Sequence, residues 1–401
     1  MRKVYYWFRL EDETLKYYSY FSLSLHVAGI YLHIPFCKKA CHYCDFHFST
    51  SLQYKDELLN AMHTEIAMQQ QYLQGQTIQT IYFGGGTPSL IGALEIQKLI
   101  DKITSHHTVS ADAEITLEAN PDDLDATSVK GLKHTGINRF SIGVQSFFEE
   151  DLIWMNRAHN AMEADSAVKR VQDAGFENIT LDLIYGYPLL SNEKWQSNIQ
   201  KAIHLDIPHV SAYGMTVEPR TALAAFISKG KQQSMNESQS AEQYLTLIEM
   251  LETGGFEHYE TSNFAKPGCY SRHNTNYWKG VSYLGIGPSA HSFNGASRQW
   301  NIANNAKYIS GILKGNIPAE HEILSQKNRI NEYIMTSLRT AWGMDLDKIE
   351  KDFGSDYRNI ITQSLPEFLE KRQIILEKGT IKLTREGKLF ADSIAAELFI
   401  T

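Results

Sequence analysis

Three cysteines stand close together near residue 40, in the segment Cys37-Lys-Lys-Ala-Cys41-His-Tyr-Cys44. Three thiolates on one tight loop can ligate an iron–sulfur cluster and leave one of its four irons without a protein ligand. The alternatives are a three-cysteine zinc site completed by His42 or His47, or buried free thiols. The spacing is not that of the CxxC pairs usual in zinc sites, and the loop follows a predicted strand, so we favour the cluster.

The composition agrees with a compact protein that holds such a cluster. The chain of 401 residues has only four cysteines, and three of them fall within eight residues, which is not a disulfide framework but suits a reducing, cytoplasmic environment. The net charge is −8, so no basic stripe for nucleic acid is expected. These features favour a soluble metalloprotein with no nucleic-acid partner.

The first 26 residues carry acidic side chains and lack an apolar stretch of about 20 residues, so we expect neither a transit peptide nor stable membrane insertion. A strand pattern starts abruptly at Val27. We therefore interpret residues 1–26 as an N-terminal extension that precedes the natural start of the protein.

Six runs of β-branched and aromatic residues alternate with helical periodicity between residues 29 and 217, which predicts an α/β fold with a parallel sheet. The expected strands cover 29–35, 77–85, 113–120, 137–145, 177–186 and 209–217, and expected helices include 54–74, 192–205 and 239–253. Functional groups in parallel α/β folds gather at the carboxyl ends of strands. The cysteines follow the first predicted strand, and polar or glycine-rich groups end the others.

The second half of the chain has a less regular pattern of predicted helices and strands. Residues 236–324 contain a Gly- and aromatic-rich stretch, and residues 325–401 contain helices and a hairpin, 377–384, that turns at Gly379. This order suggests a winged-helix-like α+β domain. Because residues 325–401 hold 12 basic and 12 acidic side chains, a substrate lid or docking module is favoured over a DNA-binding role.

The cysteine loop resembles the CxxxCxxC motif of the radical S-adenosylmethionine (radical SAM) superfamily. The likeness to its oxygen-independent coproporphyrinogen III oxidase (HemN-like) family runs from about Gly29 to the C-terminus. It rests on YLHIPFC at 31–37, FGGGTPS at 83–89, LEANP at 117–121 and SIGVQSF at 141–147. The resemblance implies a partial (β/α)6 barrel over 27–235, a HemN-like continuation over 236–324 and a HemN C-terminal domain over 325–401.

The resemblance also implies a 4Fe–4S cluster on Cys37, Cys41 and Cys44 and S-adenosylmethionine on its open iron. The reduced cluster then cleaves the sulfonium to a 5′-deoxyadenosyl radical. Tyr31 would lie against this cofactor, and Gly85, Gly86 and Thr87 would meet its methionyl end, because glycine permits close backbone approach.

Further cofactor contacts are implied at Glu118, which would accept from ribose hydroxyls, and at Gln145, Arg157 and Asp182. The alternatives are an ordinary strand-end acid for Glu118 and an exposed ion pair for Arg157. Phe46 would either cover the adenine or pack in the core.

Two features point to one branch of this family. The coproporphyrinogen oxidases carry a fourth cysteine where this chain has Phe46, and they have a longer N-terminal region. The segment His273-Asn-Thr-Asn-Tyr277-Trp278 matches the HNxxYW motif of the HemW-type heme chaperones. His273 is thus the candidate heme contact, since imidazole is a good axial ligand, and a structural histidine is the alternative.

Three hypotheses remain. The first is a heme chaperone with a reductant such as flavodoxin or ferredoxin and heme-receiving clients such as respiratory proteins. The second is a coproporphyrinogen III oxidase that decarboxylates propionates in porphyrin biosynthesis. The third is a zinc-stabilised binding module without radical chemistry.

Overall fold

The computed structural model describes residues 27–401, so the predicted extension, residues 1–26, lies outside the described residues. The strands of the main sheet are β1 (Val27–Ile34), β2 (Thr77–Gly85), β3 (Val109–Ala119), β4 (Arg139–Gln145), β5 (Ile179–Tyr185), β6 (His209–Gly214), β7 (Glu257–Glu260), β8 (Asn263–Ala265), β9 (Ser282–Ile286), β10 (His291–Phe293), β11 (Ser297–Asn301) and β12 (Ala319–Ile323). The helices around it are α2 (Lys55–Met68), α3 (Ala93–His106), α4 (Ala126–Lys133), α5 (Glu149–Trp154), α6 (Ala161–Asp173), α7 (Asn192–His204), α8 (Ala222–Ser228), α9 (Glu237–Thr253), α10 (Arg272–Trp278) and α11 (Asn305–Leu313).

The main sheet is a partial barrel. Strands β1 to β6 pair in sequence order and all in parallel, which is the topology expected of six βα units. Sequence reasoning missed the strands that lengthen the sheet at both edges. β9 pairs in parallel with β1 and is followed by β10, β11 and β12, whereas β8 and β7 continue the sheet beyond β6. These strands are only three to five residues long, so their periodicity is weak.

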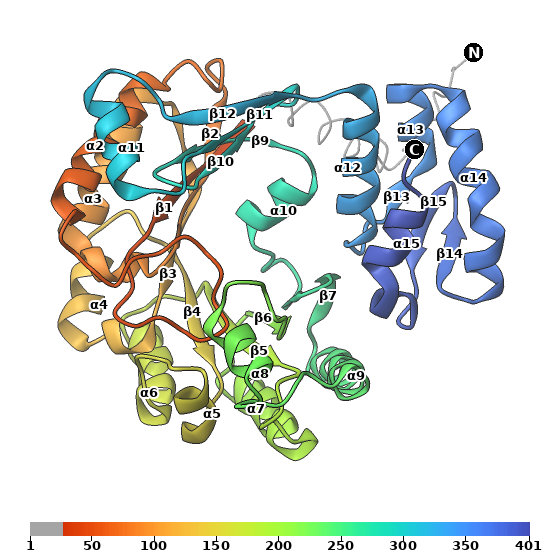
Figure 1. The fold of residues 1–401 in the computed structure, drawn as a ribbon, viewed down its shortest axis with the longest axis horizontal. Coiled ribbons are helices and arrows are strands. Elements are labelled where there is room, and N and C mark those ends of the chain that lie inside the picture. The colour runs from red at the N-terminus through yellow and green to blue at the C-terminus, as the bar shows by residue number, and fades with distance from the viewer. Residues whose placement is uncertain (1–26) are drawn as a thin grey trace, which may run out of the picture.

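The two faces of the parallel strands differ in polarity. Alternate residues such as Leu32, Phe83, Leu117, Ile142 and Leu181 are fully buried in the main hydrophobic core. Helices α2, α3, α4, α6 and α7 cover this outer face (Figure 1). The intervening residues are largely polar and face the inside of the barrel: Tyr31, Tyr82, Glu118, Ser141, Asp182 and Tyr213. Parallel sheets are usually apolar on both faces, so this polar inner face marks a place for a polar ligand.

A buried glutamate ties the outer layer together. Glu65 of α2 is fully buried and accepts hydrogen bonds from Tyr308 Oη (2.5 Å), Asn301 Nδ2 (2.7 Å) and the backbone N–H of Gly287 (2.8 Å). These partners come from α11, from β11 and from the loop after β9. One carboxylate therefore joins helix α2 to the strands added at the β1 edge.

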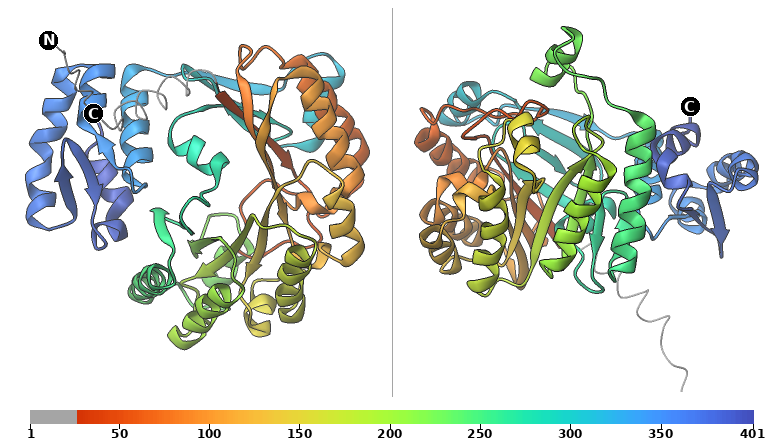
Figure 2. Two further views of the ribbon diagram at one scale, coloured as in Figure 1. Left: turned by 180° about the vertical axis from the view of Figure 1, so that it is seen from behind. Right: turned by 90° about the horizontal axis from the view of Figure 1, so that it is seen from below.

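The C-terminal residues form a second body with its own core and its own sheet (Figure 2). It contains α12 (Gln326–Leu338), β13 (Met344–Asp345), α13 (Leu346–Phe353), α14 (Ser355–Glu370), β14 (Ile374–Glu377), β15 (Thr380–Leu383) and α15 (Ala391–Glu397). The predicted hairpin is confirmed, because β14 and β15 pair in antiparallel fashion around Lys378 and Gly379, which both have positive φ. This body is the predicted C-terminal α+β domain.

One arginine fixes the C-terminal body against the barrel. Arg339, at the end of α12, donates to Glu260 Oε1 of β7 (3.4 Å) and to Asp392 Oδ1 of α15 (2.7 Å). Its guanidinium also lies 5.4 Å from the ring centroid of Trp278 in α10. Arg339 therefore connects the sheet edge, the C-terminal helix and the HNxxYW segment.

No helix among residues 27–401 is long and apolar enough to cross a membrane.

Replacing the buried glutamate should destabilise the barrel. In Glu65→Ala the buried hydroxyl of Tyr308 and the buried N–H of Gly287 lose their acceptor, and the amide of Asn301 loses one of its two acceptors, which together is expected to cost about 3 to 5 kcal/mol. Urea unfolding of the full chain, followed by circular dichroism, measures this loss. The control Glu57→Ala removes an exposed glutamate of the same helix and should change stability by less than about 1 kcal/mol.

Candidate functional site

The cysteine loop begins directly after β1 and is closed by backbone hydrogen bonds. The N–H of Cys37 donates to Ser49 O (3.0 Å), and the N–H of Ser49 donates to Pro35 O (2.8 Å). All three cysteines are half-buried. The loop is therefore fixed at both ends to the carboxyl edge of the sheet, where the sequence places it.

The segment after α5 holds the middle of this loop. Asn156 Nδ2 donates to Ala40 O (2.7 Å), the N–H of His42 donates to Met155 O (3.1 Å), and His42 Nδ1 donates to Trp154 O (2.8 Å). Asn156 has a φ of 58°, a left-handed conformation that asparagine tolerates better than most residues. The loop is thus shaped by residues more than 100 positions away.

Two side chains donate hydrogen bonds to the cysteine sulfurs. Arg157 Nη1 lies 3.4 Å from Cys41 Sγ, and Thr87 Oγ1 lies 3.5 Å from Cys37 Sγ. Burial raises the pKa of the Cys44 thiol to about 12, so a metal must displace this proton to bind the sulfur. Donors aimed at sulfur stabilise the thiolate that results.

Arg157 is 9% exposed and makes no ion pair with any residue of the described range 27–401, so the exposed ion pair considered for it is wrong. Its Nη2 donates to Asn120 Oδ1 (2.6 Å) and to Gly143 O (2.7 Å). The planar fork thus joins the ends of β3 and β4 to the cysteine loop.

The histidines that the zinc alternative requires are engaged elsewhere. Within residues 27–401 no three His, Cys, Asp or Glu side chains converge as the ligands of a single ion do. His42 is turned toward Trp154 O, and His47 Nε2 donates to Asn305 Oδ1 (2.7 Å). Neither histidine that the zinc alternative would use is therefore turned toward the cysteines.

The glycine segment lies beside this loop and packs closely against β1. A Cβ on Gly86 would lie 2.7 Å from Phe36 O, and one on Gly85 would meet the ring of His33 at 2.8 Å. The N–H groups of Gly86 and Thr87 already donate to Ile34 O (2.9 Å) and Phe36 O (2.7 Å). The glycines are therefore required for β2 to pack against β1, and these two N–H groups are not free for a ligand.

Tyr31 and His33 form a short hydrogen-bonded chain on the inner face of β1. His33 Nε2 donates to His47 O (2.9 Å), which requires the proton on Nε2, so Nδ1 accepts from the Tyr31 hydroxyl (3.2 Å). Burial lowers the pKa of His33 to about 4, in agreement with a neutral ring. The chain links the barrel interior to the backbone of the cysteine loop.

Glu118 occupies the centre of the inner face. Its carboxylate accepts from Tyr82 Oη (2.8 Å) and from the N–H of Gly85 (3.2 Å). Burial, with a smaller contribution from the charge of Asp182, raises the pKa of Glu118 to about 7. Burial likewise raises the pKa of Asp182 to about 6, although its carboxylate accepts from Ser141 Oγ. The inner face thus holds two neighbouring carboxyl groups that burial disfavours as anions.

Gln145 has a positive φ of 67° at a register shift between β4 and β5. A non-glycine residue in this conformation costs about 1 to 3 kcal/mol and is found most often where a side chain has a function. Gln145 Oε1 and Arg157 Nε are buried and have no protein partner within the described residues. Both are suitable for a polar ligand near the cysteine loop, which fits the cofactor that the sequence implies.

Phe46 is 67% exposed, so the alternative that it packs in the core is wrong. It is free to cover a planar ligand at the mouth of the barrel.

His273 lies in helix α10, inside the opening of the barrel, rather than in a loop (Figure 1). Its ring stacks on Tyr82 with 4.9 Å between centroids, and its Nδ1 lies 2.9 Å from Thr80 Oγ1. Burial lowers the pKa of His273 to about 4, so the imidazole is neutral. Tyr277, one turn later, is 42% exposed. The motif therefore has a half-buried histidine and an accessible aromatic end.

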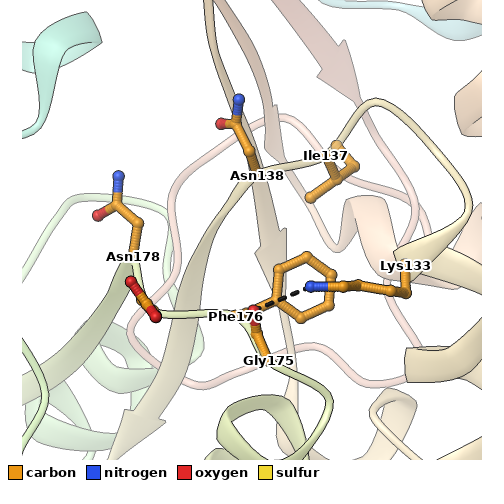
Figure 3. A pocket seen from close by; sticks show the side chains of 7 residues that line it. Lys133, Ile137, Asn138, Gly175, Phe176 and Asn178 are labelled. Carbon is orange, nitrogen blue, oxygen red and sulfur yellow. Dashed lines mark hydrogen bonds between the residues drawn. The ribbon is translucent and has the colours of Figure 1, made fainter.

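Two cavities lie away from the cysteine loop. A surface hollow of about 430 Å³ at the amino ends of β4 and β5 is lined by Asn138, Phe176 and Asn178, and Lys133 lies over Phe176 (Figure 3). Parallel barrels carry their chemistry at the opposite edge. The other, between Tyr82, Arg139 and Asn274, has about 10 Å³, room for about one water molecule.

Sequence reasoning missed several residues that the fold brings to the site. They are His33, Tyr82, Thr80, Glu114 and Asn120, which contact predicted site residues through hydrogen bonds or ring stacking. Asn120 directly follows β3, and the other four are polar side chains within strands of a parallel sheet, where apolar residues are usual.

Glu118 should make stability depend on pH. Because its pKa is raised, its contribution to stability is complete below about pH 4.5 and is lost as the pH rises through about 7. Glu118→Gln stays neutral, so at pH 8 we expect it to exceed the wild type in stability by about 1 to 2 kcal/mol, after allowance for solvent screening. Calorimetry at pH 5 and pH 8 measures the difference. An equal effect at both values would contradict this assignment, and Glu57→Gln serves as the exposed control.

Comparison with known proteins places this site in a family. Residues 31–202 match the Radical SAM superfamily, and residues 324–390 match the HemN C-terminal domain. The chain is 22% identical to the structure of coproporphyrinogen III oxidase (HemN) from Escherichia coli, with a TM-score of 0.81 over 95% of this chain and 93% of that one. At this identity the likeness shows the fold.

Curated relatives extend over nearly the whole chain. The heme chaperone HemW of Escherichia coli (strain K12) is 38% identical over 382 residues, which cover 93% of this chain and 98% of the relative. The heme chaperone HemW of Bacillus subtilis (strain 168) is 34% identical over 368 residues, which cover 91% and 97%. The chain therefore belongs to the radical SAM superfamily and, within it, to the HemW family.

Proposed function

We propose that this protein is a heme chaperone that holds a 4Fe–4S cluster, binds S-adenosylmethionine and carries heme to client proteins. The observation that carries the proposal is the presence, in one barrel, of the three-cysteine loop at the sheet edge and the neutral imidazole of His273 in its opening. The names of the HemW relatives support the heme part of the proposal.

Cys37, Cys41 and Cys44 would ligate the cluster, with Arg157 and Thr87 donating to the sulfurs. The cluster supplies one-electron reduction of S-adenosylmethionine when both are bound. The part of the inner face that lies next to the cysteine loop would hold this cofactor. Gln145 Oε1 and Arg157 Nε, which lack protein partners, are suited to its amino and carboxylate groups, and Glu118 has carboxylate lone pairs for ribose hydroxyls.

Asp182, Tyr31, Gly85, Gly86 and Phe46 would complete the cofactor site. Asp182 lies beside Glu118, and Tyr31 stacks on Tyr82 with 6.1 Å between ring centroids. Because the N–H of Gly86 is engaged, any contact from the glycine segment to the methionyl group would use carbonyl oxygens.

His273 would bind heme iron through Nε2. If Nδ1–H donates to Thr80, Nε2 carries the lone pair, and Nε2 has no hydrogen-bond partner in the described part of the chain. The cavity next to Tyr82 and Asn274 is far too small for a porphyrin. Heme would therefore approach from the accessible side of α10, where Tyr277 and Trp278 offer aromatic surface.

The competing function is oxidative decarboxylation of coproporphyrinogen III, which shares this fold. We disfavour it because Phe46 occupies the place of the fourth cysteine that the resemblance leads us to expect in those enzymes.

The test uses protein reconstituted anaerobically with iron and sulfide. One sample receives reductant, S-adenosylmethionine and coproporphyrinogen III, and product is followed by chromatography. A second is titrated with heme and followed by its Soret absorption. We expect no decarboxylated product, and stoichiometric heme binding that His273→Ala weakens about 10-fold or more, as loss of a metal ligand would.

Cys41→Ala is the control for the cluster, and it should lose iron and acid-labile sulfide. Catalytic turnover of coproporphyrinogen III would overturn the chaperone proposal. One zinc per chain without sulfide would overturn both radical SAM functions.

A further inference from the structure

The carboxylate of Glu114 binds the first residues of helix α10 through hydrogen bonds. Glu114 of β3 is 5% exposed, and its two oxygens accept from the backbone N–H groups of Arg272 (3.1 Å) and His273 (3.0 Å). These are the first two residues of the helix, where backbone N–H groups have no partner within it. A negative charge at this end also interacts favourably with the helix dipole. Glu114 therefore fixes the backbone of His273 relative to β3.

A second contact fixes the side chain of the same residue. Thr80 of β2 is fully buried, and its Oγ1 lies 2.9 Å from His273 Nδ1. Thr80 and Glu114 are direct cross-strand partners in the register of β2 and β3. One cross-strand pair thus holds His273 at two points, its backbone and its imidazole.

The third strand in this layer leaves room for the ring. Gly29 of β1 is the register partner of Thr80. A Cβ on Gly29 would lie 2.7 Å from Thr80 Oγ1 and 3.4 Å from the ring of His273. The ring is then covered by Tyr82, which stacks on it. Residues of the neighbouring strands β1, β2 and β3 therefore surround the imidazole of His273 and fix it in one orientation.

We propose that Thr80 and Glu114 are positioning residues for His273, which hold its Nδ1 against the barrel wall and leave Nε2 as the nitrogen for a metal ligand. Nδ1–H donates to the Thr80 hydroxyl, so Nε2 keeps its lone pair. Partners of this kind orient a histidine ligand and select its tautomer. The inference rests on the proposed function where the metal is heme iron, but the orientation of His273 is a property of the protein alone.

The first experiment uses the full chain without heme. In protein labelled with 15N-histidine, NMR should show the Nδ1–H tautomer for the His273 signal, assigned by its loss in His273→Ala. Thr80→Val removes the hydroxyl at nearly constant volume and should abolish this preference, whereas Thr80→Ser should restore it. Hydrogen exchange of peptides that cover Ser271–Trp278 should become faster in Glu114→Gln, because an amide offers only one acceptor to the two N–H groups.

The second experiment measures heme. Thr80→Val and Glu114→Gln should each raise the dissociation constant for heme by about 10-fold and shift the Soret band, and Thr80→Ser should return both toward the wild-type values. Thr116→Val is the matched control. Thr116 is a fully buried threonine of β3 whose hydroxyl has no partner in the part of the protein that the structure describes, so its replacement should change neither the tautomer nor the heme spectrum.

The outcomes separate this inference from the proposed function. If the wild type binds heme through His273 but Thr80→Val and Glu114→Gln leave affinity, spectrum, tautomer and exchange unchanged, the positioning roles are wrong. If the wild type binds no heme, the proposed function fails, and the tautomer and exchange measurements alone decide the positioning roles. Heme binding that is unaffected by His273→Ala would overturn the assignment of Nε2 as ligand.

Discussion

A parallel sheet with one polar, enclosed face needs hydrogen-bond partners for the polar groups on that face, and this constraint shapes the whole protein. Cross-strand contacts supply many of these partners: Tyr82 donates to Glu118, Ser141 donates to Asp182, and Ser211 donates to Asn263. The outer face is apolar and is covered by the helices that pack on it. The hydrophobic effect holds the sheet in shape from outside, and hydrogen bonds set the positions of the inner groups.

Some inner groups are held at a cost to stability. Glu118 and Asp182 are carboxyl groups whose pKa values burial raises, and Gln145 has a backbone conformation that is unfavourable for its residue type. Such features persist only where the surrounding structure is stable enough to enforce them. The large apolar core and the satisfied Glu65 on the outer side provide that stability. The strained and the stabilising residues thus occupy opposite faces of the same sheet.

The second constraint concerns the HNxxYW segment. Its helix is too short to be stable alone, so its position depends on tertiary contacts. Glu114 and Thr80 hold its first residues inside the barrel, while Arg339 of the C-terminal body lies over Trp278 at its other end. The C-terminal domain therefore contacts the candidate heme segment directly. The docking or lid role expected from its balanced charge stays a prediction.

The sequence by itself determined the six parallel strands, the cysteine loop, the family and the C-terminal hairpin. Each of these leaves a local signal: strand and helix periodicity, cysteine spacing, motif residues and a Lys-Gly turn. Only the tertiary structure decided which residues meet. The strands β7 to β12, the burial of Arg157 and the exposure of Phe46 could not be predicted, because they depend on pairing and packing between distant segments. Thr80 and Glu114 are an ordinary threonine and glutamate in the sequence, and they contact His273 only because β2, β3 and a segment about 160 to 190 residues later meet inside one barrel.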